Sequence, residues 1–279
     1  MVSVSHSVAA QSDFDQFLTV LSEGLSEVEK SSLKNAVEYA WEAYGNKTLG
    51  SGERIWSHAL GMSVIIAGLK MDAESRIAAM LFAIPAQDEH GIARIEERFG
   101  KPAAHLVGGI SRLNKLRPIT EGFVAANLEA GEVNPVEVKA QVEVLRKMLL
   151  AMVEDIRVVM LRLASRTQTL RFYAANPGDL RVQVARETLE LYSPLANRLG
   201  VWELKWELED LSFRFIHPDV YKKIAKMLDE KRSERENFIV DAVAKVRAEL
   251  AASGVDKAEV YGRPKHIYSI WNKMRKKSV

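Results

Sequence analysis

Residues 262–274, with the sequence GRPKHIYSIWNKM, carry side chains suited to binding phosphate. Arg263 offers a planar fork of donors to phosphate oxygens, whereas Lys265 and Lys273 each offer a compact positive charge. Ser269 lies four residues after Lys265 and four before Lys273, so one helix would place these side chains on a common face. The pattern therefore favours an anion site.

Two backbone signals support a turn before that helix. Gly262 and Pro264 fix a turn, and the amino terminus of the helix that follows would itself favour anions. The alternative is a solvated basic helix end, because residues 275–277 read RKK.

Histidines and carboxylates elsewhere lack the spacing of a metal or acid–base site. A lone histidine on a helical face is more often a hydrogen-bonded packing residue than a ligand, and we interpret His58 in this way. His90 and His105 have no partner at the spacing of a metal-binding helix. Glu154 and Asp155 fall in a strongly periodic segment, where adjacent residues point about 100° apart. We interpret them as a solvated or ion-paired helix face.

Bulk composition excludes several classes of protein. The chain has 279 residues, 47% hydrophobic, enough for a full core and about two domains. A formal charge of +2 gives no field that would imply nucleic-acid binding, and the absence of cysteine excludes thiolate chemistry and disulfides. The first residues lack the features of a secretory signal, and the most apolar stretch, residues 77–86, is about half of the ~20 residues that span a bilayer. We expect a cytoplasmic protein with no membrane contact.

Apolar residues recur at spacings of three and four, which predicts a mainly helical protein. The expected helices cover about residues 26–44, 57–69, 72–84, 92–99, 102–116, 135–175, 180–192, 196–215, 219–252 and 266–277. Ser26 and Glu29 form the pattern of a capping box, Asp72 is a predicted N-cap, and Pro85 is a predicted helix breaker. Residues 117–134 are expected to be a partly ordered excursion, and residues 255–261 a short strand.

Four runs, at residues 146–166, 187–215, 231–239 and 262–274, together resemble the RelA/SpoT family of alarmone synthetase/hydrolases. The match extends from about His58 to the last residue. The resemblance implies a helical HD-type hydrolase domain, residues 1–197, followed by the helical start of an α/β nucleotidyltransferase-like synthetase domain, residues 198–279. In the family, that synthetase transfers pyrophosphate from ATP to the ribose 3′-hydroxyl of GDP or GTP.

The hydrolase half departs from the family at the positions that do chemistry. The resemblance implies a histidine, an adjacent His-Asp pair and a distant Asp around one divalent metal, usually manganese, which activates water. Only the first histidine is kept, as His58. The replaced positions are Phe82 and Ala83 for the His-Asp pair, Ala86 and Gln87 for a following Glu-Asp pair, and Ser165 for the distant Asp. Phenyl and methyl groups donate no lone pair, so we expect no metal, no cofactor and no hydrolysis in this domain.

The guanine pocket that the resemblance implies is altered as well. Its Arg-Lys-Ser-Gly loop is replaced by Leu49, Gly50, Ser51 and Gly52. The Asn and Thr that contact the base in the family have become Thr169 and Phe172. We therefore expect no guanosine site here, and we expect Phe82 and Phe172 to fill part of the former cavity.

In the synthetase half, the resemblance assigns ATP phosphate binding to Arg263, Lys265, Ser269 and Lys273. The family's Mg²⁺-binding acidic residue and its catalytic glutamate lie beyond Val279, so no catalytic residue is expected in this stretch. The 279 residues alone should be inactive. The complete protein is expected to use ATP, GTP or GDP and Mg²⁺, and any ribosome contact would use regions outside these residues.

Three functions compete. The first is a GTP pyrophosphokinase whose inactive hydrolase domain regulates the synthetase through residues 187–215, with Trp202 and Trp206 packing between domains. The second is a non-enzymatic helical interaction module that binds through residues 219–252. The third is a residual Mn²⁺-dependent ppGpp 3′-pyrophosphohydrolase that depends on His58.

Overall fold

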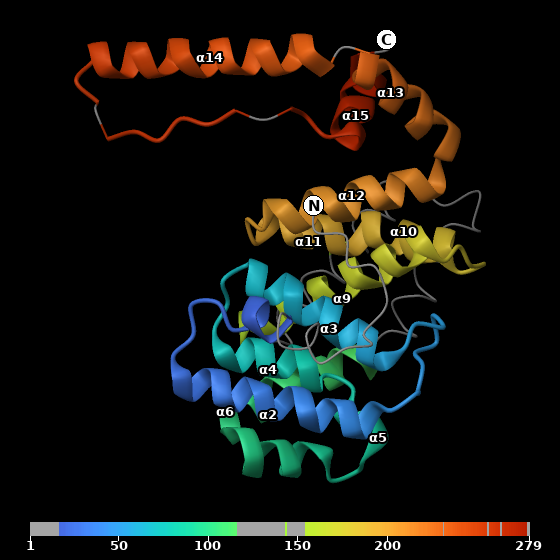
Figure 1. Ribbon diagram of the computed structural model, residues 1–279. Coiled ribbons are helices and arrows are strands. Elements are labelled where there is room, and N and C mark those ends of the chain that lie inside the picture. Colours follow the sequence, from blue (N-terminus) through green and yellow to red (C-terminus); the bar gives the residue numbers. More distant parts are fainter. Residues whose placement is uncertain are drawn as a thin grey trace. The chain divides into compact units, whose positions relative to one another are not determined.

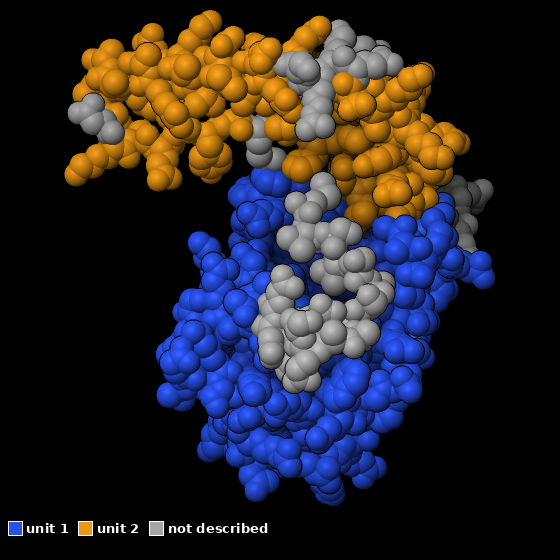
Figure 2. Space-filling view, viewed as in Figure 1, with its two compact units in different colours: residues 1–208 blue, residues 209–279 orange. Residues whose placement is uncertain are grey.

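The computed structural model describes residues 17–115, 143, 154–230, 232–255, 257–262 and 264–277. Within this part of the chain the secondary structure is helical and forms no β-strand (Figure 1), which confirms the prediction of a mainly α protein. The chain divides into two compact units, residues 1–208 and residues 209–279 (Figure 2). The domain boundary predicted at residues 197/198 stays a prediction.

Unit 1 is a bundle of helices. Its described elements are α2 (Glu27–Tyr44), α3 (Ile55–Gly68), α4 (Ala73–Leu81), α5 (Ile84–Gln87), α6 (Gly91–Lys115), α9 (Ile156–Ala175), α10 (Arg181–Glu187), the π-helix η1 (Thr188–Tyr192) and α11 (Ser193–Arg198). Helix α12 (Trp202–Ile216) begins in unit 1 and ends in unit 2. Helices α13 (Pro218–Glu230), α14 (Arg232–Ala252) and α15 (Ile267–Lys277) belong to unit 2.

Helix α3 lies at the centre of unit 1, packed against α4 and α9. It is apolar on every side, as expected for a helix surrounded by protein. Met62 and Ile66 are fully buried, and burial of each contributes about 1.5–3 kcal/mol. His58 therefore enters the core as part of a helix that is held there by its apolar neighbours.

The predicted caps of the first helices are confirmed. Ser26 and Glu29 form a reciprocal capping box at the start of α2, and Asp72 accepts a hydrogen bond from the Ser75 amide at the start of α4. Pro85 does not end the preceding helix as predicted, because α4 stops at Leu81 and Pro85 occupies the first turn of α5.

The predicted helix boundaries near α9 need correction. Glu154 and Asp155 are not helical: Asp155 has extended backbone angles and its side chain caps α9 by accepting from the Arg157 amide. The helical prediction for residues 135–153 and the excursion at 117–134 lie outside the described residues, apart from Glu143. Sequence periodicity carries no signal for such a cap, because the apolar spacing continues across Asp155.

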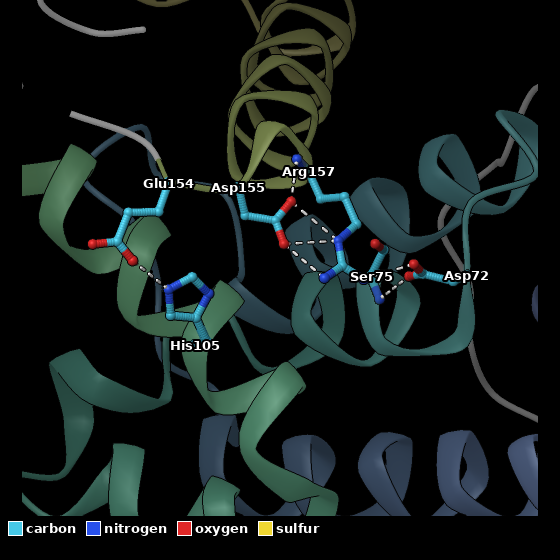
Figure 3. A network of polar contacts seen from close by, with 6 residues as sticks. All are labelled: Asp72, Ser75, His105, Glu154, Asp155 and Arg157. Atoms are coloured by element: carbon cyan, nitrogen blue, oxygen red, sulfur yellow. Dashed lines mark hydrogen bonds and ion pairs between the residues drawn. The ribbon is translucent and has the colours of Figure 1, made fainter. Parts of the chain in front are cut away.

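The Arg157 guanidinium joins the first turns of two helices (Figure 3). It donates to Asp155, the cap of α9, and to Asp72, the cap of α4, at an Nη1–Oδ2 distance of 2.7 Å. Hydrogen bonds from Arg157 hold the pKa of Asp155 below its ordinary value. Burial pushes the pKa of Asp72 upward, but hydrogen bonds from Ser75 and Arg157 outweigh it and leave that pKa lowered.

Three more helix predictions differ from the structure. The helix predicted at 180–192 does not end at Tyr192, because η1 continues directly into α11. The predicted helix at 196–215 is interrupted at Gly200, whose φ of 73° suits glycine and separates α11 from α12. The predicted helix at 219–252 is divided into α13 and α14.

Unit 2 has an aromatic core. The Phe213 ring on α12 lies 4.7 Å from the Trp271 ring and 5.6 Å from the Tyr268 ring, both on α15. Asp210 accepts a hydrogen bond from the Tyr268 amide and another from the Tyr221 hydroxyl. These contacts hold one side of α15 against α12.

The strand predicted at 255–261 is not formed by the described residues of that segment. The chain runs along α14 instead, where Arg247 donates to the Val260 carbonyl at 2.8 Å. A side chain at Gly262 would meet Ile239 of α14 at 2.6 Å, so glycine permits this close approach. A strand needs a ladder partner, and the described residues provide a helix there.

Candidate functional site

Four buried polar side chains form a hydrogen-bonded chain in unit 1. His58 Nδ1 lies 2.7 Å from Glu53 Oε2, and His58 Nε2 lies 2.9 Å from Ser165 Oγ. Gln168 Nε2 donates to the other carboxyl oxygen, Glu53 Oε1, at 2.6 Å. The side chains come from the loop before α3, from α3 and from α9.

Donors and acceptors in this chain match one another. With the imidazole proton assigned to Nδ1, His58 donates to Glu53 and accepts at Nε2 from the Ser165 hydroxyl. Glu53 then accepts at both carboxyl oxygens, from His58 and from Gln168. The interpretation of His58 as a hydrogen-bonded packing residue agrees with this geometry.

Phe82 closes the remaining side of His58. The two rings lie 5.2 Å apart, and Phe82 is buried together with Ala83. Tyr44 packs its ring 6.4 Å from Phe82, and its hydroxyl donates to the Met80 carbonyl and accepts from the Ala83 amide. Burial raises the pKa of the Tyr44 hydroxyl, so it stays protonated as this bridge requires.

The Ser–His–Glu connectivity is that of a serine hydrolase triad, but the setting differs. Ser165 lies in the middle of α9, where the backbone N–H groups are bonded within the helix, and its residue is 7% exposed. An oxyanion hole needs free donors beside an accessible nucleophile. The arrangement therefore holds helices together rather than attacking a substrate.

These residues do not fit the metal of an HD hydrolase. A divalent cation takes about three protein ligands in an open site, and Phe82 and Ala83, at the positions where the resemblance implies a His-Asp pair, donate no side-chain lone pair. In the part of the chain that the structure describes, no group of three or more His, Cys, Asp or Glu side chains is placed to hold a metal ion. Ala86 and Gln87 are exposed on α5.

The other altered positions lie apart from the His58 cluster or at its edge. Leu49 and Gly52 form a turn closed by a 2.8 Å backbone hydrogen bond, which includes Gly50 and Ser51. Thr169 donates its hydroxyl to the Ser165 carbonyl one helical turn back. Phe172 is half-buried and its ring lies beside Tyr173, so of the two predicted cavity fillers Phe82 is the one placed against His58.

Three of the four predicted phosphate-binding residues are described. Lys265 and Lys273 are exposed and Ser269 is half-buried, whereas Arg263 lies outside the described residues. Helix α15 begins at Ile267, so Ser269 and Lys273 share a helical face but Lys265 precedes the helix. The prediction of one common helical face is thus wrong for Lys265.

Two members of the buried chain, Glu53 and Gln168, were not predicted from the sequence. Glu53 sits in a loop five residues before His58, a spacing that matches no helical face. Gln168 follows Ser165 by three residues, which does place both on one face of α9. That spacing was the one available signal.

Comparison with known proteins gives the family. A family model described as an HD domain matches residues 36–202, more than half of the chain. GTP pyrophosphokinase of Escherichia coli K12 is 45% identical over 220 residues, which cover 78% of this chain and 28% of the relative. Guanosine-3′,5′-bis(diphosphate) 3′-pyrophosphohydrolase of Haemophilus influenzae is 39% identical over 236 residues, 85% of this chain and 32% of the relative.

The bifunctional (p)ppGpp synthase/hydrolase SpoT of E. coli K12 is 34% identical over 261 residues, 94% of this chain and 35% of the relative. An HD-type helical bundle with these relatives defines the class of the protein. The chain belongs to the HD-domain family, within its RelA/SpoT branch. It spans about a third or less of the length of the relatives it matches.

Proposed function

We propose that the chain is the amino-terminal region of a GTP pyrophosphokinase whose HD domain no longer hydrolyses ppGpp. In the complete protein, ATP and GTP or GDP are the substrates and Mg²⁺ is the cofactor of the synthetase. The protein works in the cytoplasm, where these nucleotides are found. Within the described residues, no helix combines the length and apolarity that crossing a bilayer requires.

Two observations support pyrophosphate transfer by the complete protein. Several relatives are named GTP pyrophosphokinases, with identities of 39–45%. The Phe213 ring packs against Tyr268 and Trp271 and so holds α15 in place, while Lys265 and Lys273 stay exposed. Lys265 lies just before the amino terminus of α15 and Lys273 lies further along the helix, and exposed lysines of this kind suit the phosphates of a nucleotide.

The observation that carries the loss of hydrolysis is the closed environment of His58. Both of its ring nitrogens are engaged within the protein, and Phe82 covers a ring face. Activating water near neutral pH requires a bound metal with an open coordination position. His58 offers no free nitrogen, and in the described part of the chain no group of three or more His, Cys, Asp or Glu side chains could hold a metal there.

The direct test is incubation of the chain with ppGpp and Mn²⁺, with pyrophosphate release as the readout. We expect no release above the rate without protein, whereas E. coli SpoT serves as the positive control. Release that requires Mn²⁺ and disappears in His58→Ala would establish the residual-hydrolase alternative instead.

We propose further that the HD domain regulates the synthetase through residues 187–215, most of α12 among them, and that α9 contacts this segment. The Arg171 guanidinium on α9 donates two hydrogen bonds to the Glu207 carboxylate on α12, at 2.5 and 2.8 Å. Helix α12 then continues into unit 2. A regulatory role requires contacts that differ between two states, and an exposed ion pair of this kind can form in one state and break in another.

Trp202 and Trp206 mark the start of α12. Their rings stack at 6.3 Å, and Trp202 remains 49% exposed, so its packing is partial. Replacing either residue with Ala in the complete protein, and measuring pppGpp synthesis with and without activating conditions, tests the regulatory proposal. We expect altered regulation; unchanged rates and unchanged regulation in both variants would refute it.

One observation favours the interaction module as a second candidate. On α14, the large apolar side chain of Phe238 is 73% exposed. A helical adaptor would bury it against a partner. Phe238→Ser should then abolish partner binding, and the complete protein should synthesise no pppGpp; synthesis of pppGpp would favour the pyrophosphokinase.

A further inference from the structure

We infer that Glu53, His58, Ser165 and Gln168 form a metal-free clasp that takes over the structural work of the lost ion. The clasp joins the loop before α3 and α3 itself to α9, which is distant in sequence. The inference rests on the proposed loss of the metal site, and it does not depend on synthetase activity.

The four side chains of the clasp are almost fully buried, so their hydrogen bonds matter for stability. Glu53 and His58 are each 1% exposed, and Ser165 and Gln168 are 7% and 8% exposed. Water cannot replace a partner that leaves, so each unpaired donor or acceptor would be costly. The clasp therefore stabilises one arrangement of α3 against α9, and any slip of either helix breaks several bonds together.

The geometry keeps one half of a metal site and replaces the other half. A metal-binding histidine presents one nitrogen to the ion and donates its second ring N–H to a carboxylate that orients the ring. His58 retains the orienting carboxyl in Glu53. At the other nitrogen, the Ser165 hydroxyl now supplies the contact.

Gly61 leaves room for the side chain of Gln168, the fourth residue of the clasp. It lies one turn after His58 on α3, and a Cβ built there would come within 2.1 Å of Gln168 Oε1. The Gln168 side chain thus crosses the α3 backbone at Gly61, where that backbone carries no side chain. This is how its amide reaches Glu53 across the helix contact.

A double-variant cycle tests whether the four residues act as one unit. Ser165→Ala and Gln168→Ala each remove one outer hydrogen bond of the clasp, to His58 and to Glu53 respectively. We expect each to lower the Tm by roughly 2–4 °C per broken contact, and the double variant to lose clearly less than the sum. Additive losses would overturn the inference, since they would mean independent contacts.

The matched control is Ser63→Ala. Ser63 is also a buried serine, on α3, but its hydroxyl contacts Met80 Sδ at 3.2 Å, outside the clasp. Paired with Gln168→Ala, it should give additive changes in Tm. Equal coupling in both pairs would show a general softening of the core and would also overturn the inference.

Gly61→Ala gives a second route that leaves all four clasp residues in place. The added methyl displaces Gln168 and should lower the Tm, although alanine favours a helix. Adding Gln168→Ala should then recover part of the loss, because the obstructed side chain is gone. No loss in Gly61→Ala, or no recovery in the double variant, contradicts the clasp.

The metal provides the last readout. The Tm of the native chain should be the same with Mn²⁺ and with EDTA, because the clasp leaves no ligand nitrogen exposed. A Tm that rises with Mn²⁺ and stops responding in His58→Ala would show a working ion site and would overturn the inference. Absence of ppGpp hydrolysis would not save the clasp inference in that case, so the clasp and the proposed loss of hydrolysis can be refuted separately.

Discussion

His58 shows how neighbours decide what an imidazole does. In an ion site one ring nitrogen must stay available to the metal, whereas here a hydroxyl and a carboxyl occupy both. A phenyl ring at residue 82 adds an apolar wall where a ligand would be needed. The loss of hydrolysis that we propose would therefore follow from the residues around His58, not from His58 itself.

At the residue scale, Tyr44 gives the first prediction. Its hydroxyl bridges the Met80 carbonyl and the Ala83 amide beside the altered site. Tyr44→Phe should lower the free energy of unfolding by about 1–3 kcal/mol, because it leaves two buried backbone groups unpaired. Urea denaturation measures the change. Tyr39→Phe on the same helix, at a half-buried position, should stay within about 0.5 kcal/mol; equal losses would contradict the bridge.

The sequence predicted part of this site and missed the rest for a physical reason. Residue types at positions 82, 83 and 165 indicated that a metal set was broken, because ligand chemistry is a property of the side chain alone. The partners of His58 depend on tertiary contacts across 107 residues of chain, to Ser165, and on a loop that brings in Glu53. No local pattern encodes such contacts.

At the scale of elements, caps were predictable where the signal was local. Ser26 with Glu29, and Asp72, are followed by helices as the sequence indicated. Asp155 was assigned to a helix interior because the apolar stripe runs on, yet its side chain caps α9. A cap inside a continuous apolar pattern is set by the Arg157 contact, which comes from the fold.

The Asp155 cap gives a pH-dependent prediction. Because Arg157 lowers the pKa of Asp155 in the folded state, the contact stabilises the fold above the unfolded pKa and is lost as the pH falls through the lower, folded pKa. The native chain should therefore lose stability below about pH 4. Asp155→Asn should be less stable at pH 7, and its free energy of unfolding should fall less steeply at acid pH, which gives a flatter acid limb in a plot of stability against pH. Denaturant melts across pH 2–7 measure both effects.

Arg157→Gln provides the matching partner test. It removes the donor and leaves Asp155 in place, so it should flatten the same acid limb. An acid limb that keeps its slope in both variants would show that the link between the starts of α4 and α9 contributes nothing measurable.

At the scale of the whole molecule, the fold does not depend on the metal ligands that the family resemblance implies. The HD-domain match spans residues 36–202, and the helical core around α3 is intact although the expected ligands are replaced. Apolar burial over many residues stabilises such a bundle, whereas a metal site depends on a few side chains. Fold class could therefore be predicted from periodicity, while the extent of each unit depended on packing.

Restoring the ligands should restore the ion but not the hydrolysis. Phe82→His, Ala83→Asp and Ser165→Asp in one chain would give His58 three partners, and Mn²⁺ at 100 times its Kd should add about 2.7 kcal/mol of stability. A rise in Tm with Mn²⁺ measures binding. Adding His58→Ala should remove that rise. The triple variant should still not cleave ppGpp, because Ala86 and Gln87 remain.

No response to Mn²⁺ in that triple variant would mean that these positions do not converge on one point, contrary to the alignment with the family. Ser165→Asp alone is the control, since two ligands are too few for a stable site. It should not respond to Mn²⁺.

The synthetase proposal is tested in the complete protein by comparing two exposed lysines of α15. Lys273 shares a helical face with Ser269, four residues earlier, whereas Lys276 is equally exposed at the helix end. If Lys273 contacts ATP phosphates, Lys273→Ala removes a charge-assisted contact worth about 1.5–3 kcal/mol. The kcat/KM for ATP should then fall roughly tenfold or more. Lys276→Ala changes the net charge by the same amount, so it controls for long-range attraction and should have little effect. Equal losses of kcat/KM in the two variants would mean that α15 attracts ATP by its overall positive charge and not through a specific contact of Lys273.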